Sequence, residues 1–260
     1  MCAQSLVETF SGLLNFKNPI PLMIDRMGIR KTAYHVATRS GLRLHLRPGM
    51  VGDRYSCFET FGIGVYDIAL ARLRPGDTVI DIGANIGCFA LAAWQAVGAR
   101  GRVLALEPVS RTFERLTANV AMNDATSVEP LRLALADHIG DLKLFTPPEQ
   151  YLFASKFNSI DGRNFSGEMQ QVPCTTITAL LERHHIERVA LLKLDCEGSE
   201  HEIVHSMNAE AAAKIDHIVM ELHNVPGWQN DATISHLKSL GYEHGDGYTH
   251  MFSRRTSQLQ

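Results

Sequence analysis

Hydrophobic residues in the second two thirds of the chain follow two alternating spacings. From Thr78 onward, short apolar stretches typical of buried strands alternate with stretches whose apolar residues recur every three or four positions, as in a helix. The strand-like stretches read "TVIDIG", "RVLALEP", "VEPLRLAL", "VALLKLD" and "KIDHIVMEL". The helical stretches read "CFALAAWQAV", "RTFERLTANVAMN", "ITALLERHH", "SEHEIVHSM" and "ATISHLKSLG". This alternation predicts βαβ units on a mostly parallel sheet, in an α/β fold.

The chain before Thr78 carries weaker patterns. Residues 4–15 predict a short amphipathic helix, and residues 34–46 predict a hairpin. A polar loop is expected after Pro48-Gly49, and "VYDIALARL" predicts a helix that ends at a Pro-Gly pair.

These patterns divide the chain into two parts. We expect an N-terminal extension of helix and hairpin over residues 1–60, lying as a cap on the substrate side, and a main domain over residues 61–260. Within the domain, residues 137–176 break the regular spacing and predict an insertion with strand pieces and a mobile loop. The tail "YEHGDGYTHMFS" suits a closing β-hairpin.

Charge and cysteine content narrow the class of partner. With 25 basic and 28 acidic residues, the net charge is −3, so no chain-wide field favours nucleic acid or a membrane surface. The five cysteines are scattered and never form C-x-x-C, which argues against a disulfide framework and against a cysteine zinc site. The first residues make a poor signal peptide, and no apolar run approaches the roughly 18 residues of a membrane helix. We expect reduced thiols in a cytoplasmic protein that acts on a small molecule, with the oligomeric state left open.

A glycine turn follows the first strand of the main domain. In "VIDIGANIG", Asp81 ends the strand, and Gly83, Ala84, Asn85 and Gly87 lead into a helix. Glycine lets a ligand approach the backbone, and a helix N-terminus presents free N–H groups. A carboxylate at this place would repel a pyrophosphate but attract an ammonium and a sulfonium. The turn therefore favours S-adenosylmethionine over NAD.

The second strand ends in Glu107-Pro108. An acid at this place can accept hydrogen bonds from both ribose hydroxyls of a nucleoside cofactor. We assign Glu107 and Pro108 to the cofactor site, together with Tyr66, which can contact the amino acid end of the cofactor or the substrate entrance.

The order of these motifs resembles that of the FkbM-type methyltransferases, which are class I S-adenosylmethionine-dependent enzymes. The matching segments are "GVYDIALARLRPGDTVIDIGANIG", "LALEP", "LLKLDCEGSEHEIV" and "IVMELH". The resemblance implies a Rossmann-like, seven-stranded class I fold and methyl transfer, most often to a hydroxyl of a sugar or another natural product. Amine and carboxylate acceptors also occur in the family. An NAD-dependent enzyme and a non-catalytic scaffold protein stay open as alternatives.

The third motif places several ionisable residues at the end of a central strand. The family's usual Lys-[IL]-Asp-x-Glu-Gly-x-Glu maps onto residues 193–200, with Asp195 and Glu197 facing the crevice. Lys193 lies in an apolar strand and needs an acid partner, for which Glu221 on the next strand is the expected one. His223, at the rim of the same crevice, titrates near neutrality when unperturbed and is a candidate general base. Asp195, Glu197, Glu221, His223 and Lys193 are the catalytic candidates, and structural roles for Lys193 and His223 are as well supported.

The same motif contains His201 and His205 in an H-E-x-x-H pattern typical of zinc peptidases. The longer form of that motif fails, because Asn208 and Ala211 stand where it requires Gly and His. We expect both imidazoles to point largely toward solvent and predict no metal ligands. Mg²⁺ at the strand-end carboxylates is possible but has no dedicated motif.

Overall fold

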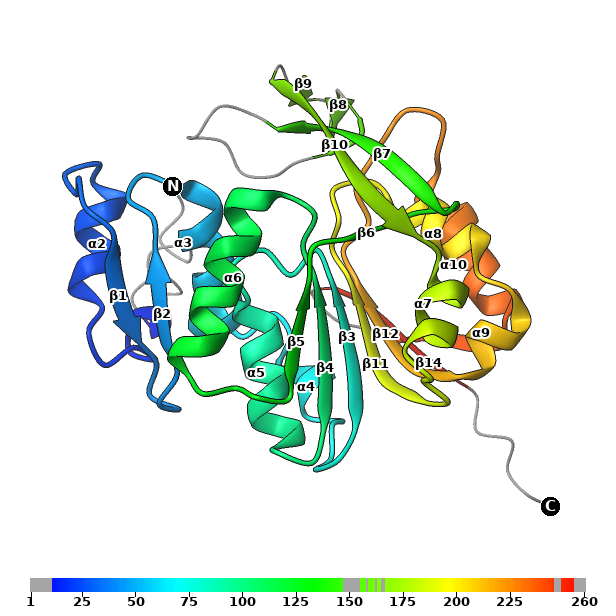
Figure 1. The fold of residues 1–260 in the computed structure, drawn as a ribbon, viewed down its shortest axis with the longest axis horizontal. Helices are drawn as coiled ribbons and strands as arrows, with labels where there is room; N and C mark the ends of the chain where they lie inside the picture. Colours follow the sequence, from blue (N-terminus) through cyan, green and yellow to red (C-terminus); the bar gives the residue numbers. More distant parts are fainter. Residues whose placement is uncertain are drawn as a thin grey trace.

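The computed structural model describes residues 11–146, 155–157, 159–161, 163–164, 167–245 and 249–254. Its centre is a seven-stranded sheet in the order β13-β14-β12-β11-β3-β4-β5 (Figure 1). Strand β14 runs antiparallel to β12 and β13, and the pairs from β12 to β5 are parallel. The strands are β3 (Thr78–Ile82), β4 (Arg102–Leu106), β5 (Val128–Leu131), β11 (Val189–Leu194), β12 (Ile215–Met220), β13 (Tyr242–Gly245) and β14 (His250–Arg254).

Helices cover both faces of this sheet (Figure 1). One face carries α4 (Asp67–Leu70), α5 (Cys88–Val97) and α6 (Ser110–Met122). The other face carries α7 (Ile177–Arg183), α8 (Glu200–Ser206), α9 (Ala209–Ala213) and α10 (Asn230–Ser239). Successive strand residues face opposite sides, so Val79 joins the core under α5 while Ile80 and Ile82 join the core under α7 and α8. The predicted seven-stranded α/β fold is confirmed.

The N-terminal part adds α2 (Ile20–Arg26), a hairpin of β1 (Tyr34–Ala37) and β2 (Arg43–Leu46), α3 (Val51–Phe58) and a π-helix, η1 (Glu59–Ile63). The predicted hairpin is confirmed. The predicted polar loop after Gly49 is wrong, because its polar residues lie on α3 and form ion pairs with residues outside that helix: Asp53 pairs with Arg47, and Arg54 pairs with the buried Asp25. The division at residue 60 stays a prediction; helical structure runs across it from residue 51 to residue 63.

The prediction for the third strand is partly corrected. The third strand was expected as one run through Leu135, but β5 ends at Leu131 and β6 (Ala134–Leu135) joins a separate sheet with β7 (Gly140–Thr146) and β10 (Glu168–Thr175). These strands, with the short pair β8 (Ser159–Ile160) and β9 (Arg163–Asn164), are the strand pieces expected in the insertion. The mobile loop expected within residues 137–176 stays a prediction; residues 147–154 of this interval lie outside the described residues, as do residues 4–10 of the expected N-terminal helix.

Among the described residues, no helix is both long and apolar enough to cross a lipid bilayer.

Candidate active site

Two turns meet at the carboxyl ends of β3 and β11, the neighbouring strands at which the strand order reverses. Ligands of open α/β sheets bind at such a switch point. The first turn, residues 83–87, follows β3; the second, residues 195–199, follows β11. We call them the cofactor turn and the acidic turn.

The cofactor turn is held in left-handed backbone conformations, with φ of 74° at Gly83, 49° at Asn85 and 92° at Gly87. A Cβ on Gly83 would lie 1.9 Å from the carbonyl oxygen of Asp195, and one on Gly87 would lie 2.7 Å from Cδ1 of Leu116. Glycine at position 83 is therefore required by packing against the backbone of the acidic turn, and at position 87 it is favoured by the left-handed φ. The N-terminus of α5 receives no side-chain cap from Gly87, which leaves backbone donors of the kind that hold anionic or polar ligand groups.

Glu107 lies beside this turn with its carboxylate already oriented. Its Oε2 accepts from the backbone N–H of Asn85 at 3.1 Å, and its Oε1 accepts from that of Val109 at 2.9 Å. Burial raises the pKa of Glu107 to about 7, although these two hydrogen bonds act in the opposite direction. Each carboxylate oxygen has a second lone pair, so the ribose contact predicted for Glu107 remains chemically available. Ala84 is buried in the turn, and Pro108 is half-buried between Glu107 and Val109.

Asp81 and Lys193 form a buried ion pair that joins the two strands. They are direct neighbours in the register of β3 and β11, and Lys193 Nζ lies 3.1 Å from Asp81 Oδ1. The prediction that Glu221 is the partner of Lys193 is wrong. In the register of β11 and β12, Lys193 stands opposite Val219, and the side chain of Glu221, which follows the end of β12, is 52% exposed. Lys193 Nζ also donates to the carbonyl of Gly83 at 2.9 Å.

The charges of this pair shift each other's pKa. Burial raises the pKa of Asp81, and the Lys193 ammonium opposes that shift. For Lys193, burial acts to lower the pKa, but Asp81 and Asp195 outweigh it and keep the ammonium charged. Neither oxygen of Asp81 has a hydrogen bond of good geometry within the described part of the chain, so the carboxylate keeps unused acceptor capacity.

Tyr66, which directly precedes α4, connects that helix to the acidic turn. Its hydroxyl donates to Asp195 Oδ2 at 3.1 Å, and its ring packs edge-on against Phe89 in the first turn of α5. Tyr66 thus contacts both the first turn of α5, which follows the cofactor turn, and the acidic turn. A cofactor contact of Tyr66 stays a prediction.

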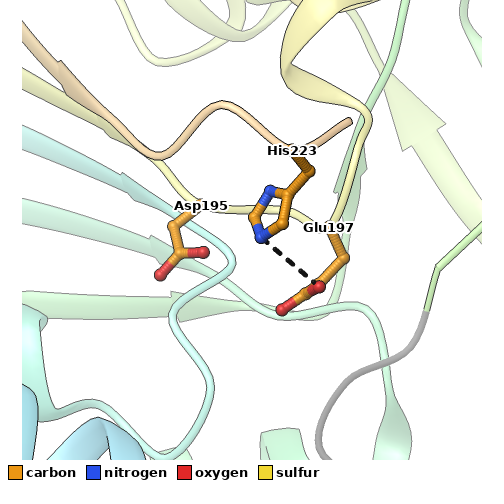
Figure 2. Close-up of side chains that lie close together, drawn as sticks. All are labelled: Asp195, Glu197 and His223. Carbon is orange, nitrogen blue, oxygen red and sulfur yellow. Dashed lines mark ion pairs between the residues drawn. The ribbon is translucent and has the colours of Figure 1, made fainter. Parts of the chain in front are cut away.

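The acidic turn and the loop after β12 bring three catalytic candidates together. Figure 2 shows the imidazole of His223 between the carboxylates of Asp195 and Glu197, all three with ligand atoms within 4.8 Å of one another. His223 Nε2 lies 3.5 Å from Glu197 Oε2 and 3.9 Å from Glu221 Oε1. The predicted crevice residues therefore form one cluster, which we call the acid–histidine cluster (Asp195, Glu197, Glu221 and His223).

Two buried residues of α8 hold His223 in place. Glu200, fully buried, accepts from His223 Nδ1 at 3.2 Å and from the backbone N–H groups of Cys196 and Gly198 at 2.7 and 2.8 Å. His201 was expected to face solvent, but it is fully buried because its Nε2 reaches the carbonyl of His223 at 2.9 Å and its Nδ1 reaches the Thr233 hydroxyl of α10 at 2.7 Å.

This arrangement decides against the zinc-peptidase interpretation. Both ring nitrogens of His201 are engaged with protein partners, so neither is open to a metal. His205 is exposed, as expected, and stacks with His236.

The pKa of His223 differs from the expected value near neutrality. Burial alone would lower it, but the hydrogen bond to Glu200 and the charges of Glu200, Glu197 and Asp195 raise it to about 11. In this arrangement His223 is an imidazolium at neutral pH, because the buried carboxylate of Glu200 favours the charged ring. Burial also raises the pKa of Glu197, against the influence of His223.

Glu59 is a site residue that the sequence did not reveal. It begins the π-helix η1, is half-buried, and has its pKa raised to about 8 by burial and by the charges of Asp195 and Glu221. Single π-helical turns occur frequently at functional sites. No sequence signal marks Glu59, because the segment carries no motif and was expected to be a loop.

The insertion touches the acidic turn from outside. The Ser155 hydroxyl donates to the backbone carbonyl of Glu197 at 2.6 Å. A Cβ on Gly198 would lie 2.9 Å from the ring of Phe157 and 2.5 Å from Val225. The insertion therefore forms part of the wall next to the acid–histidine cluster.

Known proteins resemble this chain in sequence. Methyltransferase sdnD of Sordaria araneosa is 28% identical over 189 residues, which are 63% of this chain and 72% of that protein. The 31-O-demethyl-FK506 methyltransferase FkbM of Streptomyces tacrolimicus is 26% identical over 182 residues, 60% of this chain and 69% of its own. Among solved structures, methyltransferase FkbM from Methylobacillus flagellatus is 13% identical with a TM-score of 0.47, covering 77% of this chain and 53% of that chain.

The family model described as the methyltransferase FkbM domain matches residues 81–244. The match begins at Asp81 and includes Glu107, Lys193, both turns and His223. This chain therefore belongs to the FkbM family and is an S-adenosylmethionine-dependent methyltransferase.

Proposed function

We propose that this enzyme transfers the methyl group of S-adenosylmethionine to a hydroxyl of a small acceptor, a sugar or another natural product. The observation that carries the proposal is the acid–histidine cluster next to the cofactor turn: the turn that bears Asp195 and Glu197 packs directly on Gly83. A hydroxyl acceptor needs an oriented hydrogen bond and a group that takes its proton, and this cluster contains both kinds of group. The name of the Streptomyces tacrolimicus relative, which specifies 31-O-demethyl-FK506, supports a natural-product hydroxyl.

The residues of the cofactor turn fit the bound cofactor chemically. Asp81 supplies a buried negative charge with unused acceptor capacity, and Glu107 supplies oriented carboxylate oxygens. The left-handed turn and the uncapped N-terminus of α5 leave backbone donors beside them. We assign Asp81, Gly83, Ala84, Asn85, Gly87, Glu107, Pro108 and Tyr66 to this site.

The catalytic roles follow from the charge of each group. The sulfonium of the cofactor supplies an electrophilic methyl group, so the protein's main task is to hold the acceptor oxygen in line with it. The His223 imidazolium is suited to donate a hydrogen bond that orients the acceptor, and Asp195, Glu197 or Glu221 is suited to accept its proton. Lys193, buried and directed at Asp81 and Gly83, is suited to position the two turns.

The partner we propose is a small hydroxylated molecule, with no role for nucleic acid or membrane, in a cytoplasmic enzyme. The N-terminal extension is proposed as a cap on the acceptor side, since its residue Glu59 lies close enough to Asp195 and Glu221 for their charges to raise its pKa.

The proposal is tested by methyl transfer from isotope-labelled S-adenosylmethionine to matched panels of glycosides, hydroxylated macrocycles, amines and carboxylic acids. We expect label on a hydroxyl oxygen. Label found only on amines or carboxylates contradicts the acceptor class. Glu107→Gln should weaken cofactor binding in calorimetry, and unchanged affinity would remove Glu107 from the cofactor site.

A further inference from the structure

The acid–histidine cluster contains more negative charge than its own cations compensate. Lys193, the nearest ammonium, is already paired with Asp81 at 3.1 Å and is 3.6 Å from Asp195. One imidazole, His223, then faces the carboxylates of Asp195, Glu197, Glu200 and Glu221. Carboxylates gathered in a largely buried place are costly unless a cation or protons offset them.

The side chain of His223 is aimed into the middle of this cluster. It is 7% exposed, and its Nδ1 is fixed by the fully buried Glu200. Nε2 therefore points to the other side, where its contacts are 3.5 Å to Glu197 and 3.9 Å to Glu221. A direct charge-assisted hydrogen bond would be about 2.7–2.9 Å, so the carboxylates stand back from the ring nitrogen.

The 3.5 Å between His223 Nε2 and Glu197 Oε2 lies in the range open to two ligands of one ion. Two ligand atoms about 2.1 Å from an ion are about 3 Å apart at right angles and about 4.2 Å apart on opposite sides. One atom each of Asp195, Glu197 and His223 lies within 4.8 Å of the others (Figure 2). The contacts of Asp195 with Tyr66 and Lys193 use Oδ2, which leaves Oδ1 to coordinate.

The residues around the cluster have the form of an outer shell of a metal site. A ligating histidine usually donates its second ring N–H to a carboxylate, which fixes the ring and its tautomer. Glu200 does this for His223 and is itself held by two backbone N–H groups. His201 fixes the backbone of His223 from the other side.

We propose that Asp195, Glu197 and His223 bind one divalent cation, such as Mn²⁺ or Mg²⁺. Two carboxylates and one imidazole are a ligand set for ions that accept both oxygen and nitrogen. The ion takes the place of the Nε2 proton of His223, which is released to solvent, since a ligating imidazole is neutral. Open coordination positions would bind the acceptor hydroxyl and make it easier to deprotonate. This last role rests on the proposed function, whereas binding of the ion does not.

The test is a titration of chelator-treated protein with Mn²⁺. Binding is measured by electron paramagnetic resonance, which detects the free ion, and by calorimetry. We expect one Mn²⁺ per chain with Kd at or below roughly 1 mM, the weak end of such sites. His223→Gln and the size-matched Glu197→Gln should each weaken binding at least about tenfold, and Glu200→Gln, which loses only the positioning contact, by about 10–100-fold. His138→Gln is the matched control, because it removes an exposed imidazole that pairs with Asp137 at 2.7 Å.

Mn²⁺ should also raise the melting temperature of the wild-type protein but not that of His223→Gln, provided that both unfold cooperatively. Equal affinity in wild type, His223→Gln and Glu197→Gln would overturn the site, as would loss of binding in the His138→Gln control. Failure of the proposed function is separate: it appears as label found only on amines or carboxylates, whether or not Mn²⁺ binds. Full methyl transfer in the presence of chelator, together with no Mn²⁺ binding, would overturn the metal-site proposal and leave the proposed function standing.

Discussion

The cofactor turn and the acidic turn follow neighbouring strands and pack on each other, yet the acidic side chains at the two turns differ in how far their charge is compensated. Beside the cofactor turn each acid has a partner: Asp81 of β3 lies against Lys193, and Glu107, after β4, accepts from two backbone N–H groups. In the acidic turn Asp195 and Glu197 share His223 with Glu221 and with the buried Glu200. Compensated acids suit a rigid binding surface, whereas carboxylates in excess suit proton transfer and cation binding.

The largest effect is expected from the variant that breaks the ion pair between Lys193 and Asp81, which joins the two strands that bear the turns. Lys193→Met leaves Asp81 as an uncompensated buried charge and should lower the free energy of unfolding by about 3–5 kcal/mol in urea denaturation. The double variant with Asp81→Asn should regain much of this. Lys214→Met, in an exposed pair with Glu187, should cost less than about 1 kcal/mol. Equal losses in Lys193→Met and Lys214→Met would contradict the buried ion pair as the link.

Gly83→Ala tests the backbone contact between the turns. The methyl group would overlap the Asp195 carbonyl in a left-handed residue, and we expect a loss of about 2–4 kcal/mol together with weaker cofactor binding. Gly28→Ala is the matched control, with φ of +71° and nothing within 4 Å of the added Cβ. It should cost only about 1 kcal/mol. If both variants lose the same stability, the close approach of the turns is not what requires Gly83.

His223→Gln separates chemistry from cofactor binding. We expect kcat to fall about 100-fold, because an oriented donor or metal ligand is lost from the acceptor side. S-adenosylmethionine affinity should stay within about twofold of wild type, since the cofactor turn is unchanged. His205→Gln changes an exposed histidine on α8 and should leave both quantities unaltered. Undiminished kcat in His223→Gln would exclude it from catalysis.

The smallest expected effect concerns pH. The pKa of Glu59 is about 8 in the folded protein, against 4.5 for a free carboxyl, so the folded state holds this proton more tightly. The free energy of unfolding should therefore fall as pH rises from about 4.5 to about 8. Glu59→Gln removes this loss.

Above pH 8, Glu59→Gln should be more stable than wild type by about 1–2 kcal/mol, a reduced value because water screens a half-buried carboxylate. Below pH 4.5 the two proteins should have equal stability in chemical denaturation. A constant difference across the whole pH range would show that Glu59 does not titrate in this window.

Sequence periodicity was sufficient for the sheet and for the two turns, because buried strands and amphipathic helices have distinct spacings. It could not identify the partner of Lys193. Strand β11 has two neighbours, and only the register shows that Asp81 lies beside Lys193 while Glu221 lies beyond the end of β12. Strand order depends on the whole chain, so no local pattern contains it.

The errors around His201 and Glu59 have a similar origin. His201 is buried because α10 and the loop after β12 supply hydrogen-bond partners that lie 32 and 22 residues away along the chain, respectively. The segment before Glu59 resembles a loop because its polar residues Asp53 and Arg54 find their partners outside the helix, in Arg47 and Asp25. In both cases the polar residues predict exposure to solvent, whereas hydrogen-bond or ion-pair partners that are distant in the sequence allow these groups to be buried.

The carbonyl of Asp195 lies so close to Gly83 that no methyl group fits between the turns. The two turns are thus one interlocked piece, in which neither half can be remodelled alone. The insertion and the segment that precedes β3 contact this piece from outside, for example through Ser155 to the Glu197 carbonyl and through Tyr66 to Asp195. Exchange of these outer segments is therefore a route by which acceptor preference can diversify while the two turns are inherited intact.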